Sequence, residues 1–191
     1  MLTELEPAPV AAVPLAEFAA HLRLGEGFGE VDAAGLDLYA RAATAGVEGL
    51  SGLALIRRRF RWTVARWPGG ARVRLPIAPV ASVEAVRMVG SDGAESFADP
   101  LSYVLVPDAV RPCLSGAGGR SLPAIPTDGR AEVTLVAGFG TDWNAVPADL
   151  RQAVLMLGAH YFEQRHVSAD PAESAPFGVR AICGRYREVR L

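Results

Sequence analysis

Three residues near the C-terminal end have types and spacing that could hold a metal ion. Glu163-x-x-His166, with His160 three residues before Glu163, matches half of a di-metal carboxylate site. That chemistry needs a second such pair and further inward-facing glutamates, whereas the one remaining histidine is His21. We therefore expect a solvated helix end, with no metal and no cofactor. A hydrolase that combines His160 and Glu163 with residues 107–130 stays an alternative, which a metal bound to the purified protein would favour.

Other stretches that could do chemistry do not complete a catalytic motif. GAGGRS (116–121) lacks the spacing and the lysine of a phosphate-binding loop. AGFG (137–140) does not supply the glycine pattern of a dinucleotide fold. GLSG (49–52) is not a nucleophile elbow, because its final glycine is wrongly spaced and no strand precedes it. We expect that the protein is not an enzyme.

The stretch RRRFRW interleaves arginines with aromatic residues, a composition that can serve nucleic-acid binding. Alternation along a strand would place Arg57, Arg59 and Arg61 on one face and bury Phe60 and Trp62 on the other. We expect the arginine face to be solvated, to meet a neighbouring subunit's carboxylates or to line a channel loosely. The alternative is a small DNA-binding module that uses Arg57, Arg59 and Arg61 and shows salt-dependent affinity for duplex.

The elements that must position these residues begin with two helices. PLAEFAAHLRL (14–24) has helical periodicity, and a second helix is expected from Asp32, as its N-cap, to about Leu50, with Gly52 as its stop. Alanines outside its apolar stripe would let another helix approach closely. The stripe consists of Leu36, Tyr39, Ala43, Val47 and Leu50.

From Ala54 the hydrophobic period changes to two, which indicates strands. The candidate strands lie in ALIRRRFRWTVARW, RVRLP, VASVEAVRMV, SYVLV and AEVTLVAGF. Turn residues and a long Gly/Pro loop around GAGGRSLPAIP separate them. A run of short strands between helices predicts a β-rich insertion, residues 54–140, in a helical core that begins with residues 1–53.

VPADLRQAVLMLGAHYFEQR (146–165) is expected to form the central helix of that core, within residues 141–166. Pro147 suits a first helical turn, and Asp149 lies where the helix dipole favours an anion. Apolar residues also fall outside the main stripe, which is typical of a helix buried in a core or an assembly. The main stripe consists of Leu150, Val154, Leu157 and Tyr161.

The last residues, 167–191, are expected to form an extended arm. HVSADPAESAPFG is polar and contains prolines, so we do not expect it to order itself, and VRAICGRYREVRL then restores apolar residues among arginines. Such a segment can fold on a partner; the alternative is a tail that folds back on its own domain. The candidate contact residues are Arg180, Ile182, Arg185, Tyr186, Arg187, Val189, Arg190 and Leu191.

Composition limits the class of protein. A chain of 191 residues, 50% of them hydrophobic, can bury one sizeable core. The net charge of −2 argues against broad electrostatic binding to nucleic acid or membrane. No apolar run reaches the ~18 residues of a membrane span, and the acidic, proline-broken N-terminus is not a secretory signal. Cys113 and Cys183 are expected to be free thiols. The predicted class is α+β.

The order of the segments resembles the head–tail connector (adaptor) proteins of long-tailed bacteriophages and bacterial gene transfer agents. The resemblance is carried by LAEFAAHLRL, DLYARAATAGVEGLSG, LPIAPVASVEAVRMVGSDGAES with SYVL, and VAGFGTDWNAVPADLRQAVLMLGAHYFEQR. The last is similar to the family signature G-[FY]-G…VP-x-x-[IL]-x-x-A…[YF]-E-x-R. Phe139 and Phe162 stand where tyrosine is common, the 107–130 loop is long, and the final tail matches least.

The resemblance implies a structural role without catalysis. Such proteins form a ring, usually dodecameric, beneath the portal protein, with DNA passing through the channel without sequence-specific binding. Their C-terminal segments reach onto the portal, and the far side of the ring receives the tail-side stopper or terminator protein. The resemblance thus makes the arm residues candidates for portal binding. It implies assembly in the bacterial cytoplasm, presence in the neck of the released particle and no membrane partner.

Overall fold

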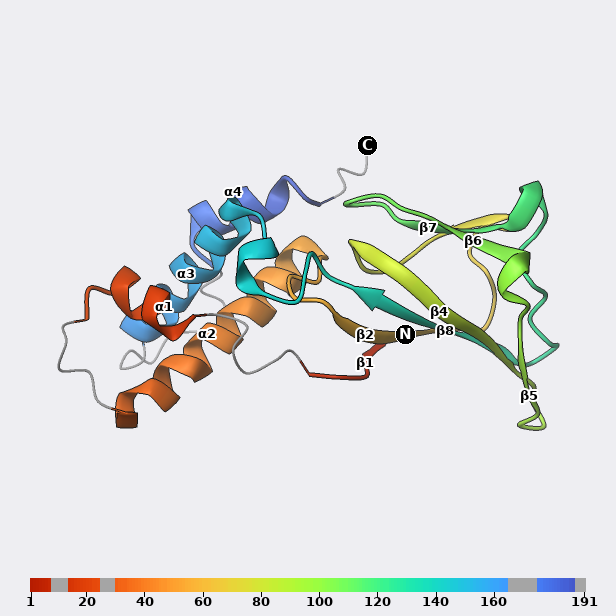
Figure 1. Ribbon diagram of the computed structural model, residues 1–191, viewed down its shortest axis with the longest axis horizontal. Coiled ribbons are helices and arrows are strands. Elements are labelled where there is room, and N and C mark those ends of the chain that lie inside the picture. Colours follow the sequence, from red (N-terminus) through yellow and green to blue (C-terminus); the bar gives the residue numbers. More distant parts are fainter. Residues whose placement is uncertain (8–13, 25–29, 165–174, 188–191) are drawn as a thin grey trace. The chain divides into compact units, whose positions relative to one another are not determined.

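The computed structural model describes residues 1–7, 14–24, 30–164 and 175–187. The chain divides into two compact units, which we describe separately. The strand unit comprises Met1–Pro7 and Arg57–Thr141, and the helix unit comprises Ala8–Ile56 and Asp142–Leu191. Figure 1 shows strands in the first and helices in the second, which confirms the predicted α+β class.

The helix unit contains α1 (Leu15–His21), α2 (Glu30–Ser51), α3 (Ala148–Glu163) and α4 (Phe177–Gly184). The long helices α2 and α3 pack together, and α1 and α4 each contact both of them. Because neighbours cover α3 on several sides, its buried residues extend beyond one stripe, as its all-round apolar sequence predicts. These residues are Leu150, Ala153, Val154, Leu155, Leu157 and Gly158.

Two glycines let the helices of this unit approach closely. A Cβ at Gly46 of α2 would lie 2.8 Å from Cδ2 of Leu157, and a Cβ at Gly158 of α3 would lie 2.8 Å from the ring of Phe18 in α1. The predicted end of α2 is confirmed, since Gly52 follows Ser51 with a φ of 75°. Its predicted start is wrong: α2 already includes Glu30, so Asp32 is not the N-cap.

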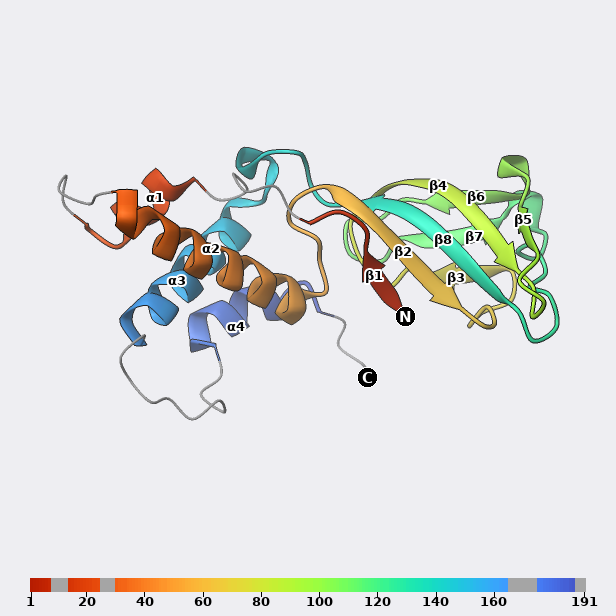
Figure 2. The same ribbon diagram turned by 90° about the horizontal axis from the view of Figure 1, so that it is seen from below.

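The strand unit consists of two antiparallel sheets. The 5-stranded sheet has the order β1-β2-β8-β4-β5 and the 3-stranded sheet has the order β3-β7-β6. Figures 1 and 2 show the sheets face to face, and apolar residues such as Trp62, Val133 and Leu114 are buried. The strands are β1 (Leu2–Glu4), β2 (Arg58–Val64), β3 (Arg72–Arg74), β4 (Val80–Val89), β5 (Glu95–Phe97), β6 (Tyr103–Val106), β7 (Cys113–Gly116) and β8 (Arg130–Ala137).

Three strands were not predicted. Residues Leu2–Glu4, which we expected in the helical core, form β1 and pair with β2 from Glu4↔Phe60 to Leu2↔Trp62. The segment 107–130, expected to be a loop, contains β7, which lies between β3 and β6. The third is β5, which pairs with the end of β4. All three strands are very short, and their pairing partners rather than their own patterns define them.

The extended arm is a wrong prediction for the part of it that the structure describes. Residues Phe177–Gly184 form α4, and Val179 and Cys183 are buried in the helix unit. The physical reason is that the apolar residues of VRAICG lie on one helical face, which packs on α2 and α3. The segments 165–174 and 188–191 of the predicted arm lie outside the described residues.

Candidate functional site

The arginine face of β2 lies on the 5-stranded sheet, opposite its buried face. Arg59 and Arg61 alternate with the buried Phe60 and Trp62, as predicted. Arg57 lies one residue before β2, and its Nη2 donates to the carbonyl oxygen of Phe139 at 3.1 Å. Of the three arginines predicted to share a strand face, only Arg59 and Arg61 belong to it, because Arg57 precedes the strand.

Arg59 is held by carboxylates of its own chain. Its Nη2 lies 2.8 Å from Oε2 of Glu84, and its Nη1 lies 3.3 Å from Oε1 of Glu6. Hydrogen bonds to Glu84 and then Glu6 raise the pKa of Arg59 above its ordinary value. Glu84 comes from β4, and Glu6 follows β1, so this guanidinium joins segments that are distant in sequence.

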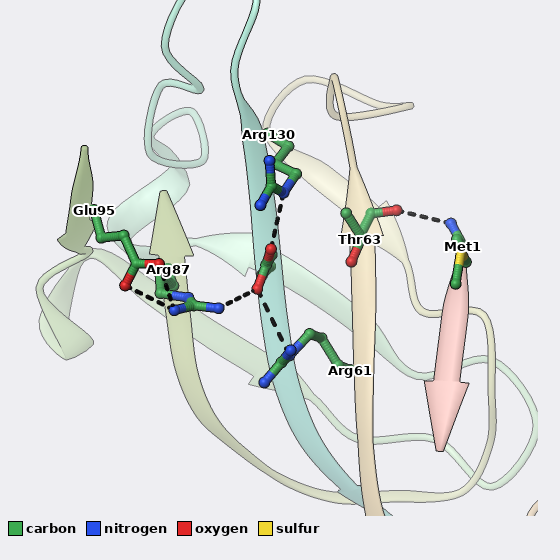
Figure 3. A network of polar contacts seen from close by, with 7 residues as sticks. Met1, Arg61, Thr63, Arg87, Glu95 and Arg130 are labelled. Atoms are coloured by element: carbon green, nitrogen blue, oxygen red, sulfur yellow. Dashed lines mark hydrogen bonds and ion pairs between the residues drawn. The ribbon is translucent and has the colours of Figure 1, made fainter. Parts of the chain in front are cut away.

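Glu132 of β8 is the centre of a larger network (Figure 3). Its carboxylate accepts from Nη2 of Arg87 at 2.5 Å and from Nε of Arg130 at 2.8 Å, and Nε of Arg61 lies 3.6 Å away. Arg87 also pairs with Glu95 of β5 at 2.7 Å. Burial alone would raise the pKa of Glu132, but hydrogen bonds from Arg87 and Arg130 outweigh it and lower that pKa.

These networks place the arginine face in a structural role. Arg59 and Arg61 both face carboxylates of their own chain, so neither a neighbouring subunit nor DNA is needed to balance their charge. Nε of Arg61 is buried and makes no hydrogen bond within the part of the chain that the structure describes. The pattern of alternating charges could reveal a polar strand face, but not the carboxylates that meet it across the sheet.

An ion pair that the sequence did not reveal joins β1 to β2, between the buried Arg58 and Glu4, whose side chain is 40% exposed. Arg58, on the buried face of β2, donates from Nε to Oε1 of Glu4 at 2.8 Å. Its guanidinium also lies over the ring of Phe60, 4.8 Å from the centroid. Removal of Glu4 would take a charged partner from the buried guanidinium of Arg58, which is destabilising.

Asp149 fixes the C-terminal helix to α3. Its Oδ2 accepts from Nη2 of Arg185 at 2.6 Å, and both of its oxygens lie 3.0 Å from the hydroxyl of Tyr186. Burial, followed by the hydrogen bond to Asp149, raises the pKa of Tyr186. The sequence marked Asp149 only as an anion favourable to the helix dipole. Its partners lie more than thirty residues later in the sequence and were not predicted.

The candidate portal-binding residues thus have different surroundings. Arg180 and Arg187 are exposed, Ile182 is partly buried, and Arg185 and Tyr186 are bound to Asp149. The remaining candidates, Val189, Arg190 and Leu191, lie outside the described residues.

The predicted metal candidates do not form a cluster in the part of the chain that the structure describes. No group of three or more His, Cys, Asp or Glu residues is arranged to hold an ion there. Glu163 is exposed, His160 is partly buried, and His166 lies outside the described residues. Cys113 and Cys183 are free, as predicted. None of the described helices has the length and apolar character needed to cross a membrane.

No protein-family model matches the chain, and no curated protein matches it. Several solved structures contain similar chains, and in three of them the alignment covers 100% of this chain and 97% of the other. A chain from the neck of an empty gene transfer agent particle, computed with C6 symmetry, is 47% identical with a TM-score of 0.87. A chain from the virion of a native gene transfer agent particle is 45% identical with a TM-score of 0.87.

The third is a chain from the neck of a native gene transfer agent particle, computed with C12 symmetry. It is 43% identical, and the TM-score is 0.84. Sequence identity at this level over the full length shows common ancestry as well as a common fold. The chain therefore belongs to the family of gene transfer agent neck proteins.

Proposed function

We propose that this chain is the head–tail connector, or adaptor, of a gene transfer agent particle. It acts as a structural protein without catalysis and forms a dodecameric ring between the portal protein and the tail-side stopper or terminator protein. DNA passes through the channel of the ring without sequence-specific binding. The protein assembles in the bacterial cytoplasm and remains in the neck of the released particle.

The observation that carries this proposal is the full-length likeness to a chain from a neck computed with C12 symmetry. A ring of identical subunits requires a heterologous contact, in which two different surfaces of the subunit meet. Among the exposed large apolar residues of the strand unit, Phe97 and Leu101 are suited to such a contact or to a contact with a neighbouring neck protein.

The C-terminal residues form the portal-binding surface in this proposal. Arg185 and Tyr186 hold α4 against α3 through Asp149, so they position the surface, whereas Arg180 and Arg187 are exposed for contact. Arginine suits bidentate pairing with the carboxylates of an acidic groove. The surface consists of Arg180, Ile182, Arg185, Tyr186, Arg187, Val189, Arg190 and Leu191.

Electron microscopy of particles tests the proposal directly. Cells that lack this chain should accumulate DNA-filled heads without tails, and the parent gene should restore tailed particles. The variant Arg180→Ser/Arg187→Ser should melt like the parent but fail to restore tails. The matched variant Arg57→Ser/Arg59→Ser removes as much charge from the β2 face and should restore them. Density for this chain outside the neck, or tailed particles without it, would contradict the proposal.

A further inference from the structure

A second group of arginines lies on the other sheet of the strand unit, along β3. Arg72, Val73 and Arg74 are exposed, buried and exposed in turn, so both arginines project from the outer face of the 3-stranded sheet. In the register of that sheet, Arg72 is opposite Ser115 of β7 and Arg74 is opposite Cys113. This outer face is separate from the arginine face of β2, which belongs to the 5-stranded sheet.

Backbone contacts bring further arginines to the two ends of β3. At the first end, the N–H of Gly116 donates to the carbonyl of Ala71 at 2.8 Å, and a Cβ at Gly116 would collide with the carbonyl of Arg120. At the other end, the N–H of Leu75 donates to the carbonyl of Pro112 at 2.9 Å, next to Arg111.

One more arginine lies near the first end of β3. Nε1 of Trp67 donates to the carbonyl of Pro123 at 2.7 Å, which brings the preceding Arg66 near the segment that contains Arg120. We call these residues the β3 arginine patch: Arg66, Arg72, Arg74, Arg111 and Arg120.

Four of the five members of the β3 arginine patch form no ion pair among the described residues. These four, Arg66, Arg72, Arg111 and Arg120, are exposed. The nearby carboxylate of Asp108 accepts from the backbone N–H groups of Val110 and Arg111, and these bonds, followed by the charges of Arg111 and Arg74, lower its pKa. Arg66, Arg72 and Arg120 therefore differ from Arg59 and Arg61, which both lie close to carboxylates.

The chemistry of the face favours phosphate over a protein surface. Protein interfaces depend on a few large anchors, mostly Trp, Tyr and Arg, whereas valine is under-represented among them. Neither β3 nor β7 exposes a large apolar side chain, and the one that β6 exposes is Val104, opposite Ser115. Arginine and serine are common donors to the phosphate oxygens of DNA, and Ser115 lies opposite Arg72. We propose that the β3 arginine patch binds the phosphate backbone of duplex DNA without reading its sequence.

The proposed function supplies the source of this DNA, because a connector channel carries the genome fragment from head to tail. The binding itself does not depend on ring formation and can be measured on the purified protein. About four phosphate contacts predict that log K falls with log salt concentration with a slope near −3.6. Affinity should then fall about a hundredfold between 50 and 200 mM salt.

Fluorescence anisotropy with two short duplexes of unrelated sequence tests the proposal. The parent protein should bind both with equal affinity. The variant Arg66→Ser/Arg72→Ser/Arg120→Ser should bind about tenfold or more weakly, and its salt slope should be less steep by about three. The matched variant Arg57→Ser/Arg59→Ser/Arg61→Ser removes the same charge from the other sheet and should retain most of the affinity. If either triple variant melts early, the single variants Arg72→Ser and Arg59→Ser replace them.

Three results would overturn the inference. They are a parent protein that does not bind DNA at low salt, equal losses in the two triple variants, and a patch variant that binds DNA like the parent. A patch variant that keeps its DNA affinity but no longer joins heads would show that the face contacts protein instead. Failure of the proposed function would appear separately, as absence of this chain from the neck in electron micrographs.

Discussion

Arg185 donates to Asp149 at 2.6 Å and thereby joins the C-cap of α4 to the first turn of α3. The hydroxyl of Tyr186 lies 3.0 Å from both oxygens of the same carboxylate. One acidic residue thus adds polar contacts to the burial of Val179 and Cys183 that packs the last described helix on the helix unit. In the proposed function this helix carries portal-binding residues, so its docking would also position them.

We predict that Asp149→Ala lowers the free energy of unfolding by about 1–3 kcal/mol, because Tyr186 loses a charged hydrogen-bond acceptor. The exposed Arg185 should contribute little of this loss. Urea denaturation followed by circular dichroism measures the change. Glu163→Ala, at the exposed end of the same helix, is the control and should stay within about 0.5 kcal/mol of the parent. Equal curves for the two variants would show that Asp149 does not hold α4.

Leu157→Ala should destabilise the protein by about 2–5 kcal/mol, because Leu157 is fully buried and its removal leaves a cavity. Leu38→Ala makes the same change on the solvent side of α2, where Leu38 is 65% exposed, and should cost under about 0.5 kcal/mol. Denaturant melts compare the two. A small loss for Leu157→Ala would mean that this stripe faces solvent.

A pair of glycine substitutions should change stability in opposite directions. Gly158→Ala forces a methyl group against the ring of Phe18, and such overpacking costs about 1–3 kcal/mol, part of which the gain in helix propensity offsets. Gly49→Ala meets no atom within 4 Å and should stabilise α2 by up to about 1 kcal/mol. Thermal melts of the two variants show whether each substitution raises or lowers stability. Stabilisation by both substitutions would contradict the packing of α1 on α3.

The pKa of Glu132 predicts a pH dependence of stability. Because this pKa is lowered in the folded state, the carboxylate stabilises the fold above the ordinary glutamate pKa of about 4.3 and loses that contribution as pH falls through the folded-state value. Glu132→Gln should therefore cost about 1–3 kcal/mol at neutral pH and progressively less in acid. Urea melts of the variant and the parent at several pH values measure this difference in stability. A difference that does not vary with pH would exclude this ionic role.

Two deletions should show which part of the C-terminal segment contributes to the stability of the fold. Removal of residues 177–191 deletes the buried Val179 and Cys183, and the loss of two such side chains should lower the free energy of unfolding by about 2–5 kcal/mol. Removal of 188–191 alone leaves α4 in place and should not change the melt. If the longer deletion melts like the parent, α4 does not belong to the core.

Local patterns predicted the elements that their own periodicity defines. The expected strand VASVEAVRMV coincides with β4, and Leu150, Val154 and Leu157 form the buried stripe that their spacing predicts. In each case one face of the element is apolar enough to be recognised without knowledge of its neighbours. The fold class followed from the order of these elements.

Elements and contacts that depend on distant residues were not predictable in this way. The strand Leu2–Glu4 is defined by its pairing with β2, roughly sixty residues later. Helix α4 is defined by its burial against α2 and α3, which come earlier in the chain. The partners of Arg59 and Arg61 come from other strands, so charge alone could not show that Glu84 and Glu132 would meet them. Long-range pairing of this kind leaves no local signature.

Residues 57–141 of the strand unit begin and end at two adjacent points of the chain. The N–H of Arg57 donates to the carbonyl of Gly140 at 2.7 Å, so the entry and exit of residues 57–141 lie side by side. Closing a short gap of this kind costs little chain entropy. The segment is therefore a cassette: it could be excised together with β1, or exchanged for another domain with adjacent ends, and the helices would still have a continuous chain to fold.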